Sequence, residues 1–145
     1  MPEPYLAISV VMMPRDANPN ASAAGGSYPV YSTVFGGVIL SHIDLAGAVA
    51  ARREVQLRGG DTAAVIVTVA VNRVEFKRPV LVGDVVKFYA WPVRFGRTSI
   101  TMRVDVVAER GGEVVPVTEA EVVYVGTDAS TPGHRPTPLG LPAAP

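Results

Sequence analysis

Residues 35–48 read FGGVILSHIDLAGA, an apolar run with a single carboxylate, Asp44, in its middle. Burying an unpaired carboxylate among apolar neighbours costs several kcal/mol of free energy, so its presence here indicates either a partner or a functional role. The pattern from about residue 34 to 57 is helical and apolar nearly all round, which indicates that other parts of the structure enclose this helix. We therefore expect a central helix that carries a reactive acid.

Both ends of this helix are marked by residues with known preferences. Ser32 or Thr33 is suited to cap its start, and Gly59-Gly60 is suited to end it. Gly36-Gly37 opens the helix, so its first N–H groups are accessible to a ligand. A carboxylate together with free main-chain donors is what the hydrolysis of an activated acyl group requires.

The segments outside the helix favour strands. Apolar and β-branched runs lie at 6–13, 63–71, 85–94, 98–108 and 114–125, and a shorter alternating segment lies at 73–77. Gly111-Gly112 predicts a tight hairpin turn before the last run. One long helix followed by antiparallel strands predicts an α+β fold, in which a curved antiparallel sheet wraps the helix.

Composition narrows the classes of function. The chain has 145 residues, no net formal charge, no cysteine and two histidines. These counts exclude disulfides, thiolate nucleophiles, Cys-based zinc or iron–sulfur sites and a His-rich metal site, and they argue against nucleic acid as the main partner. We expect no membrane span and a cytoplasmic location. One domain is expected at 1–126, with a long loop at 14–33 and a proline-rich, extended or disordered tail at 127–145.

Four motifs follow one another along the chain: MPRDANP at 13–19, FGG at 35–37 with Asp44 in the helix behind it, VEFKRPVLVGDV at 74–85, and GRTSI at 96–100. With these motifs the chain resembles the hotdog-fold acyl-CoA thioesterases, in the branch of YciA-like bacterial acyl-CoA hydrolases. The likeness spans residues 6–125. It implies a hotdog fold and hydrolysis of acyl-CoA to a free acid and coenzyme A, as part of lipid metabolism. The resemblance implies no metal, and no cofactor beyond the coenzyme A of the substrate.

The resemblance also implies a site shared between the subunits of a homodimer, and in some relatives a trimer of dimers. The spacing of the residues leads to a shared site independently. Gly37 and Asp44 lie two helical turns apart, so they share a face but are separated by about 10 Å along the axis. A thioester carbonyl is far smaller than this separation. Two antiparallel helices of a two-fold dimer bring the start of one beside the middle of the other.

In this arrangement the Gly37 N–H, helped by Gly36 and the helix dipole, holds the developing oxyanion. Asp44 acts either as a general base toward water or as a nucleophile that forms an anhydride, and the sequence leaves both open. Ser41, one turn before Asp44, is a candidate to hold its carboxylate or a water, or else bonds back to a helix carbonyl. Thr68 is a candidate to line the site and orient the water, or else a strand filler.

The loop before the helix borders the thioester in relatives. Asn18 is a candidate to close this loop over the acyl group, or else a turn former. Thr33 stands where some members of the family carry Asn or Asp. Residues 20–31 are an insertion relative to the family, which is expected to affect substrate choice or activity.

Coenzyme A carries three phosphate groups, which basic side chains bind well. The candidates near strand ends and turns are Lys77, Arg78, Arg94 and Arg97. Relatives bind the nucleotide around the segment that matches 96–99, which favours Arg97 and Ser99. Asp84, which follows Gly83, is interpreted as a turn residue without chemistry.

Other readings remain open for the same residues. Asp44 is alternatively a structural acid paired with Arg52, Arg53 or Arg73, and the two glycines before it alternatively serve close packing only. A non-catalytic hotdog domain that binds acyl-CoA is a second class of function. A dehydratase of hydroxyacyl thioesters is a third, but it needs a catalytic histidine, and His42 points to a different side of the helix from the acid.

Overall fold

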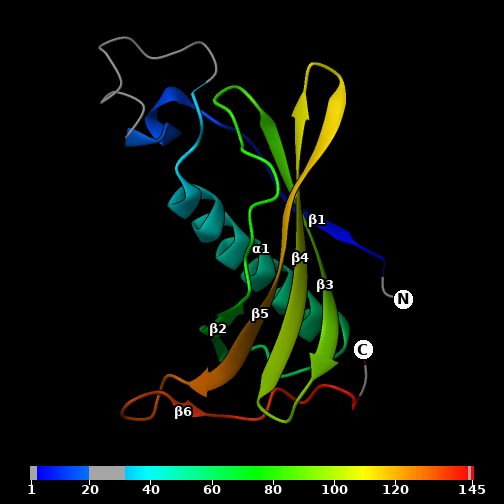
Figure 1. Ribbon diagram of the computed structural model, residues 1–145. Helices are drawn as coiled ribbons and strands as arrows, with labels where there is room; N and C mark the ends of the chain where they lie inside the picture. The colour runs from blue at the N-terminus through cyan, green and yellow to red at the C-terminus, as the bar shows by residue number, and fades with distance from the viewer. Residues whose placement is uncertain (1–2, 20–31, 144) are drawn as a thin grey trace.

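A 22-residue helix, α1 (Gly36–Leu57), crosses one face of an antiparallel sheet (Figure 1). The computed structural model describes residues 3–19, 32–143 and 145, so the insertion at 20–31 lies outside the described residues. In chain order the other elements are β1 (Tyr5–Val11), the 3-10 turn η1 (Pro14–Asp16), β2 (Val65–Asn72), β3 (Val85–Phe95), β4 (Ser99–Arg110), β5 (Glu113–Asp128) and β6 (Arg135–Pro136).

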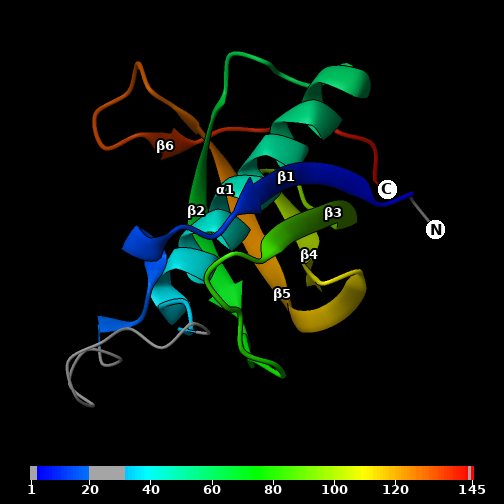
Figure 2. The same ribbon diagram turned by 90° about the horizontal axis from the view of Figure 1, so that it is seen from above.

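Over the residues that the structure describes, the sheet has six strands. Its main path runs β1-β3-β4-β5-β2, every pair is antiparallel, and β6 pairs with β5 beside this path. Gly111 and Gly112, with φ of 57° and 85°, form the predicted turn between β4 and β5. Seen from above, the strands curve around α1 (Figure 2). The prediction of an α+β fold with a helix wrapped by a curved sheet is confirmed.

The side of α1 that faces the sheet is made of small and branched residues. Its buried members are Ile39, Ile43, Ala46, Gly47, Ala50, Ala51 and Val55. They pack against the inward residues of the long strands, such as Phe88 of β3, Val104 of β4 and Tyr124 of β5. Alanine and glycine in the middle of the helix let it approach the sheet closely, because they have little or no side chain.

The outward side of α1 is open within one chain. Leu40, Leu45 and Val49 are 40%, 55% and 38% exposed. The neighbouring strand β2 ends the main path of the sheet, and it exposes three valines, Val65, Val69 and Val71. We call these six residues the open face. The sheet encloses one side of the helix, as predicted, and the outward side is open in a single chain.

The start of the helix differs from the prediction. Phe35 is the N-cap residue, and it makes no side-chain capping bond. Ser32 and Thr33 do not cap the helix, because their main-chain oxygens bond to neighbouring segments. The Val82 N–H donates to Ser32 O at 2.9 Å, and the Asn18 N–H donates to Thr33 O at 2.8 Å. The helix begins at Gly36 rather than at residue 34.

The alternating segment 73–77 is not a strand, which corrects the prediction. Arg73 has a φ of 46°, and this left-handed conformation ends the ladder that β2 makes with β5. The segment nevertheless follows β5, because the Lys77 N–H donates to Val117 O at 2.8 Å and the Thr118 Oγ1 donates to Glu75 O at 2.7 Å.

After a turn at 129–133, the described part of the tail extends along the end of the sheet, beginning with β6. The Thr137 N–H donates to Gly126 O at 2.9 Å, and the Leu139 N–H donates to Arg97 O at 3.1 Å. Leu139 is fully buried, and its carbonyl accepts the Asp61 N–H at 2.8 Å. The tail therefore connects the β3–β4 turn with the segment that follows the helix.

Candidate active site

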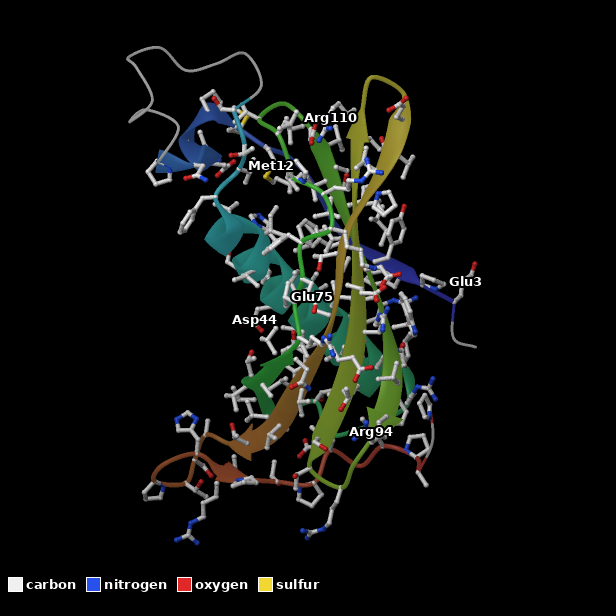
Figure 3. All side chains as sticks on the ribbon, in the orientation of Figure 1. Glu3, Met12, Asp44, Glu75, Arg94 and Arg110 are labelled. Carbon is white, nitrogen blue, oxygen red and sulfur yellow. The ribbon has the colours of Figure 1, made fainter. Side chains whose placement is uncertain are left out.

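Asp44 lies in the middle of α1 and is half-buried. Thr68 Oγ1, on β2, donates a hydrogen bond to Asp44 Oδ1 at 2.6 Å. Figure 3 shows Asp44 at the margin of the molecule, on the side of α1 and β2. The structure thus brings together two predicted site residues that are 24 positions apart.

The alternative that Asp44 is the partner of an arginine does not occur. Arg53 stacks over the Tyr5 ring at 4.3 Å, and Arg73 pairs with Glu75 at 3.1 Å. Within the described ranges, none of the ion pairs includes Asp44. Asp44 is therefore oriented by a neutral hydroxyl rather than paired with a cation.

The start of α1 presents main-chain N–H groups. Because Phe35 provides no side-chain cap, the N–H groups of Gly36 and Gly37 have neither a capping oxygen nor a partner in the helix. The Val38 N–H is already bonded to Phe35 O at 3.0 Å. The positive end of the helix dipole adds to the attraction of these donors for a negative oxygen.

Two aromatic rings flank this helix start. A Cβ on Gly37 would lie 2.6 Å from the Phe35 ring, and a Cβ on Gly36 would lie 3.6 Å from the Phe76 ring. Phe35 and Phe76 are 51% and 44% exposed, which is unusual for such large apolar side chains. Glycine at position 37 therefore serves packing against the Phe35 ring as well as access to its N–H.

A pocket of about 200 Å³ lies directly beside the helix start. Its lining residues are Val34, Gly36, Ile39, Phe76, Arg78, Pro79 and Val80. All but Gly36 and Arg78 carry apolar side chains, so the pocket suits an apolar group with one anionic neighbour. The start of α1, the pocket and a basic side chain thus occupy one end of the molecule.

Gly37 and Asp44, the two halves of the predicted site, lie at a fixed separation because one uninterrupted helix carries both. Gly37 and Asp44 are both inside α1, seven residues apart, which is about 10 Å along the axis. One chain therefore cannot direct both the Gly37 N–H and the Asp44 carboxylate at the same carbonyl.

Ser41 and His42 turn away from Asp44. Ser41 Oγ donates to Val38 O at 2.8 Å, so it bonds back to the helix. His42 Nδ1 donates to the same oxygen at 2.7 Å, and the His42 ring stacks on Phe88 with centroids 5.5 Å apart. The histidine that a dehydratase would need is thus engaged elsewhere.

Asn18 and Thr33 lie in a layer of three short segments ahead of the helix. The Asn18 N–H bonds to Thr33 O, and Thr33 forms an isolated bridge with Leu81. Both residues are half-buried. They support the entry into α1 through their main chain.

The basic candidates separate into two groups. Arg78 lines the pocket at the helix start. Lys77, the residue before it, forms an ion pair with Glu119 at 3.6 Å. Arg94, Arg97 and Ser99 belong to the β3–β4 end of the sheet, where the Gly96 N–H donates to Ser99 O at 2.9 Å. Figure 3 places Arg94 at the opposite end of the molecule from Arg110. One chain does not gather these candidates around one ligand.

Tyr124 is a neighbour of Asp44 that the sequence analysis missed. Its hydroxyl donates to Asp44 O at 2.6 Å across 80 positions of sequence. The available signal was Gly47, a glycine inside an apolar helix three residues after the acid, which indicates that another group approaches closely.

Comparisons with known proteins show the family of this chain. A family model described as the thioesterase superfamily matches residues 31–115. The acyl-CoA thioester hydrolase YciA of Salmonella typhimurium is 34% identical over 143 residues, which cover 95% of this chain and 92% of that protein. The chain belongs to the thioesterase superfamily.

Solved structures of the thioesterase superfamily are similar over most of the chain. Cj0915, a hexameric hotdog fold thioesterase of Campylobacter jejuni, has 35% identity and a TM-score of 0.70, covering 92% of this chain and 89% of that one. HI0827, a hexameric broad specificity acyl-coenzyme A thioesterase in a form with one aspartate replaced by alanine, has 29% identity and a TM-score of 0.73, covering 94% and 87%. These likenesses confirm the predicted hotdog fold and the resemblance to YciA-like hydrolases.

The helices were also compared with the requirements for membrane insertion. In the part of the chain that the structure describes, none of them has both the length and the apolar character needed to cross a membrane.

Proposed function

We infer that this chain hydrolyses acyl-CoA thioesters to the free carboxylic acid and coenzyme A. The observation that carries this inference is the hydrogen bond from Thr68 Oγ1 to Asp44 Oδ1, because it orients a half-buried carboxylate that has no cationic partner. The relatives named acyl-CoA thioester hydrolases supply the class of substrate.

The reaction needs an acceptor for a proton or an acyl group, and donors for an oxyanion. As a general base, Asp44 removes a proton from water while the water oxygen bonds to the thioester carbon, the C–S bond breaks, and the proton passes to the coenzyme A thiolate. As a nucleophile, Asp44 forms a mixed anhydride and releases the thiolate, and water then cleaves the anhydride. In both routes the N–H groups of Gly37 and Gly36 stabilise the oxyanion. Neither route requires a metal or a further cofactor.

We propose that the two halves of the site come from two copies of the chain. The open face leaves six large apolar side chains exposed, and among the described residues no strand pairs with the outer edge of β2, which together favour burial against a second copy. In a two-fold dimer with antiparallel helices, the Gly36–Gly37 end of one helix lies beside Asp44 of the other. A trimer of such dimers is consistent with the hexameric relatives.

The division of the basic residues into two groups supports the same assembly. Arg97 and Ser99, with Arg94 beside them, are the proposed contacts for the nucleotide of coenzyme A. Lys77 and Arg78 are proposed to bind a phosphate near the pocket at the helix start. A bound coenzyme A then contacts more than one subunit.

The experiment that tests the function is a measurement of free thiol released from acyl-CoAs, from acetyl to palmitoyl, by the wild type and by Asp44→Ala. We expect release by the wild type and at least about a hundredfold lower kcat/KM in the variant. Equal release by both proteins contradicts the assignment of Asp44. No release from any substrate, with coenzyme A binding retained, favours the non-catalytic binding domain instead.

The dimer is tested separately by placing a charge on the open face. Leu45→Arg and Val69→Arg are expected to give a monomer in size-exclusion chromatography with light scattering, and to lose thiol release as they dissociate, because each monomer lacks the partner's half of the site. Val114→Arg is the matched control, since Val114 is 62% exposed and lies outside the open face, in the β4–β5 hairpin. A monomeric variant with full activity contradicts the shared site.

A further inference from the structure

Tyr124 lies on β5, between the strands β2 and β4. Its register partners are Thr68 on β2 and Ile100 on β4. Thr68 binds the carboxylate of Asp44, and the Tyr124 hydroxyl binds the main-chain oxygen of the same residue, both at 2.6 Å. Two residues that are paired in the sheet therefore hold the two ends of one aspartate.

Gly47 makes room for this hydroxyl. A Cβ at position 47 would overlap the Tyr124 hydroxyl oxygen, and it would lie 3.0 Å from the ring carbon that carries this oxygen. Glycine is less stable than alanine inside a helix, and the neighbouring buried positions Ala46 and Ala50 carry alanine. The contact with Tyr124 explains why position 47 is glycine rather than alanine.

Packing alone does not account for the hydroxyl. Tyr124 is 1% exposed, and burying a phenol costs more than burying a phenylalanine ring unless the hydroxyl finds a partner. Its acceptor is a carbonyl inside α1, where the helix already provides a main-chain donor four residues later. Burial, and then the nearby negative charge of Asp44, raise the pKa of Tyr124, so its hydroxyl remains a protonated donor.

We propose that Tyr124, admitted by the missing side chain of Gly47, is a positioning residue for Asp44. Its hydroxyl fixes the main-chain oxygen of Asp44 while Thr68 fixes the carboxylate, so the acid meets the thioester carbon in one orientation. The inference rests on the proposed function and adds to it a second support for the reactive group, on the sheet side of the helix.

The test is a cycle of three variants, Tyr124→Phe, Gly47→Ala and the double variant, assayed by thiol release from an acyl-CoA that the wild type hydrolyses. Loss of one oriented hydrogen bond is expected to lower kcat about tenfold with KM nearly unchanged. Gly47→Ala displaces the same hydroxyl, so a similar fall is expected. The double variant is expected to match the single variants, because the second change removes nothing further.

Two controls separate positioning from stability. Val122→Ala removes buried methyl groups from the same strand, two residues from Tyr124, and leaves the hydroxyl of Tyr124 in place. It is expected to lower Tm at least as much as Tyr124→Phe and to keep kcat within about twofold, when assayed well below its Tm. Tyr89→Phe, on β3, removes a hydroxyl from a half-buried tyrosine and is expected to change neither quantity.

The proposal is overturned if Tyr124→Phe keeps a kcat within twofold of the wild type, or if Tyr124→Phe and Gly47→Ala multiply in the double variant. A wild type without any thiol release overturns the proposed function itself, and the positioning role with it. These outcomes are distinguishable, because only the first two occur with an active wild type.

Discussion

Asp84 and Asp44 both lie in apolar stretches, and the structure binds them in opposite ways. Asp84 is 2% exposed, and its carboxylate accepts the Leu81 N–H at 2.9 Å and both Nε and Nη2 of Arg110 at 2.9 and 2.8 Å. Asp44 is half-buried and receives a neutral hydroxyl from Thr68. Asp84 is thus held by several donors that include a cation, whereas Asp44 is oriented by a neutral hydroxyl.

Asp84 has a structural task close to the site. Arg110 also donates to Pro79 O at 3.1 Å, so the ion pair closes the loop at 79–84. This loop pairs with the residues before the helix, since the Val34 N–H donates to Val80 O at 2.7 Å. Asp84 therefore stabilises the loop that supports the start of α1 and the pocket beside it.

The largest expected effect comes from removing Asp84. Asp84→Ala removes the buried acceptor of Arg110 and of the Leu81 N–H, and it is expected to lower the free energy of unfolding by about 2–3 kcal/mol. Urea unfolding at a fixed protomer concentration measures this loss, because dimerisation contributes to the apparent stability.

The matched control is Asp105→Ala, which removes the 3.1 Å partner of Arg103 in a half-exposed pair. An exposed pair contributes at most about 1 kcal/mol. Equal losses for the two variants contradict the structural role assigned to Asp84.

A smaller effect is expected from a change of Thr68, the residue whose hydroxyl binds Asp44. Thr68→Val keeps the shape of the side chain and removes its hydroxyl, so kcat for thiol release is expected to fall about tenfold. Thr68→Ser keeps the donor and is expected to retain most of the activity. If Thr68→Val is as active as the wild type, the 2.6 Å bond has no part in catalysis.

The smallest effect is expected on the stability of the variant Asp44→Ala. Asp44→Ala removes a half-buried carboxylate without an ion-pair partner, so its free energy of unfolding is expected to stay within about 1 kcal/mol of the wild type. A loss as large as that of Asp84→Ala shows that Asp44 is also a structural acid. Urea unfolding of both variants at the same protomer concentration measures the difference.

The helix and its acid were predictable because they depend on local patterns. The apolar run after Phe35 and the glycines at 59–60 predict α1 to within two residues of its observed start. The strands follow from β-branched runs, except at 73–77, where the left-handed Arg73 turns the chain out of the ladder.

The partners of the two acids were not predictable in the same way. The contacts of Asp44 with Thr68 and Tyr124 depend on the register of β2 with β5, and the bond between Asp84 and Arg110 spans 26 positions. Spacing along the chain does not contain that information, so Asp84 was read as a turn residue. The packing of Leu139 under the end of the sheet was missed for the same reason.

The most direct test of the account compares two isosteric variants, Asp44→Asn and Asp84→Asn, in thiol release from acyl-CoA well below the Tm of both. Asparagine keeps the size of each side chain and removes its charge and basicity. The account predicts at least about a hundredfold lower kcat/KM for Asp44→Asn. It predicts a lower Tm for Asp84→Asn, with kcat/KM within tenfold of the wild type. Equal activity of Asp44→Asn and the wild type would contradict the central claim that Asp44 is the reacting acid.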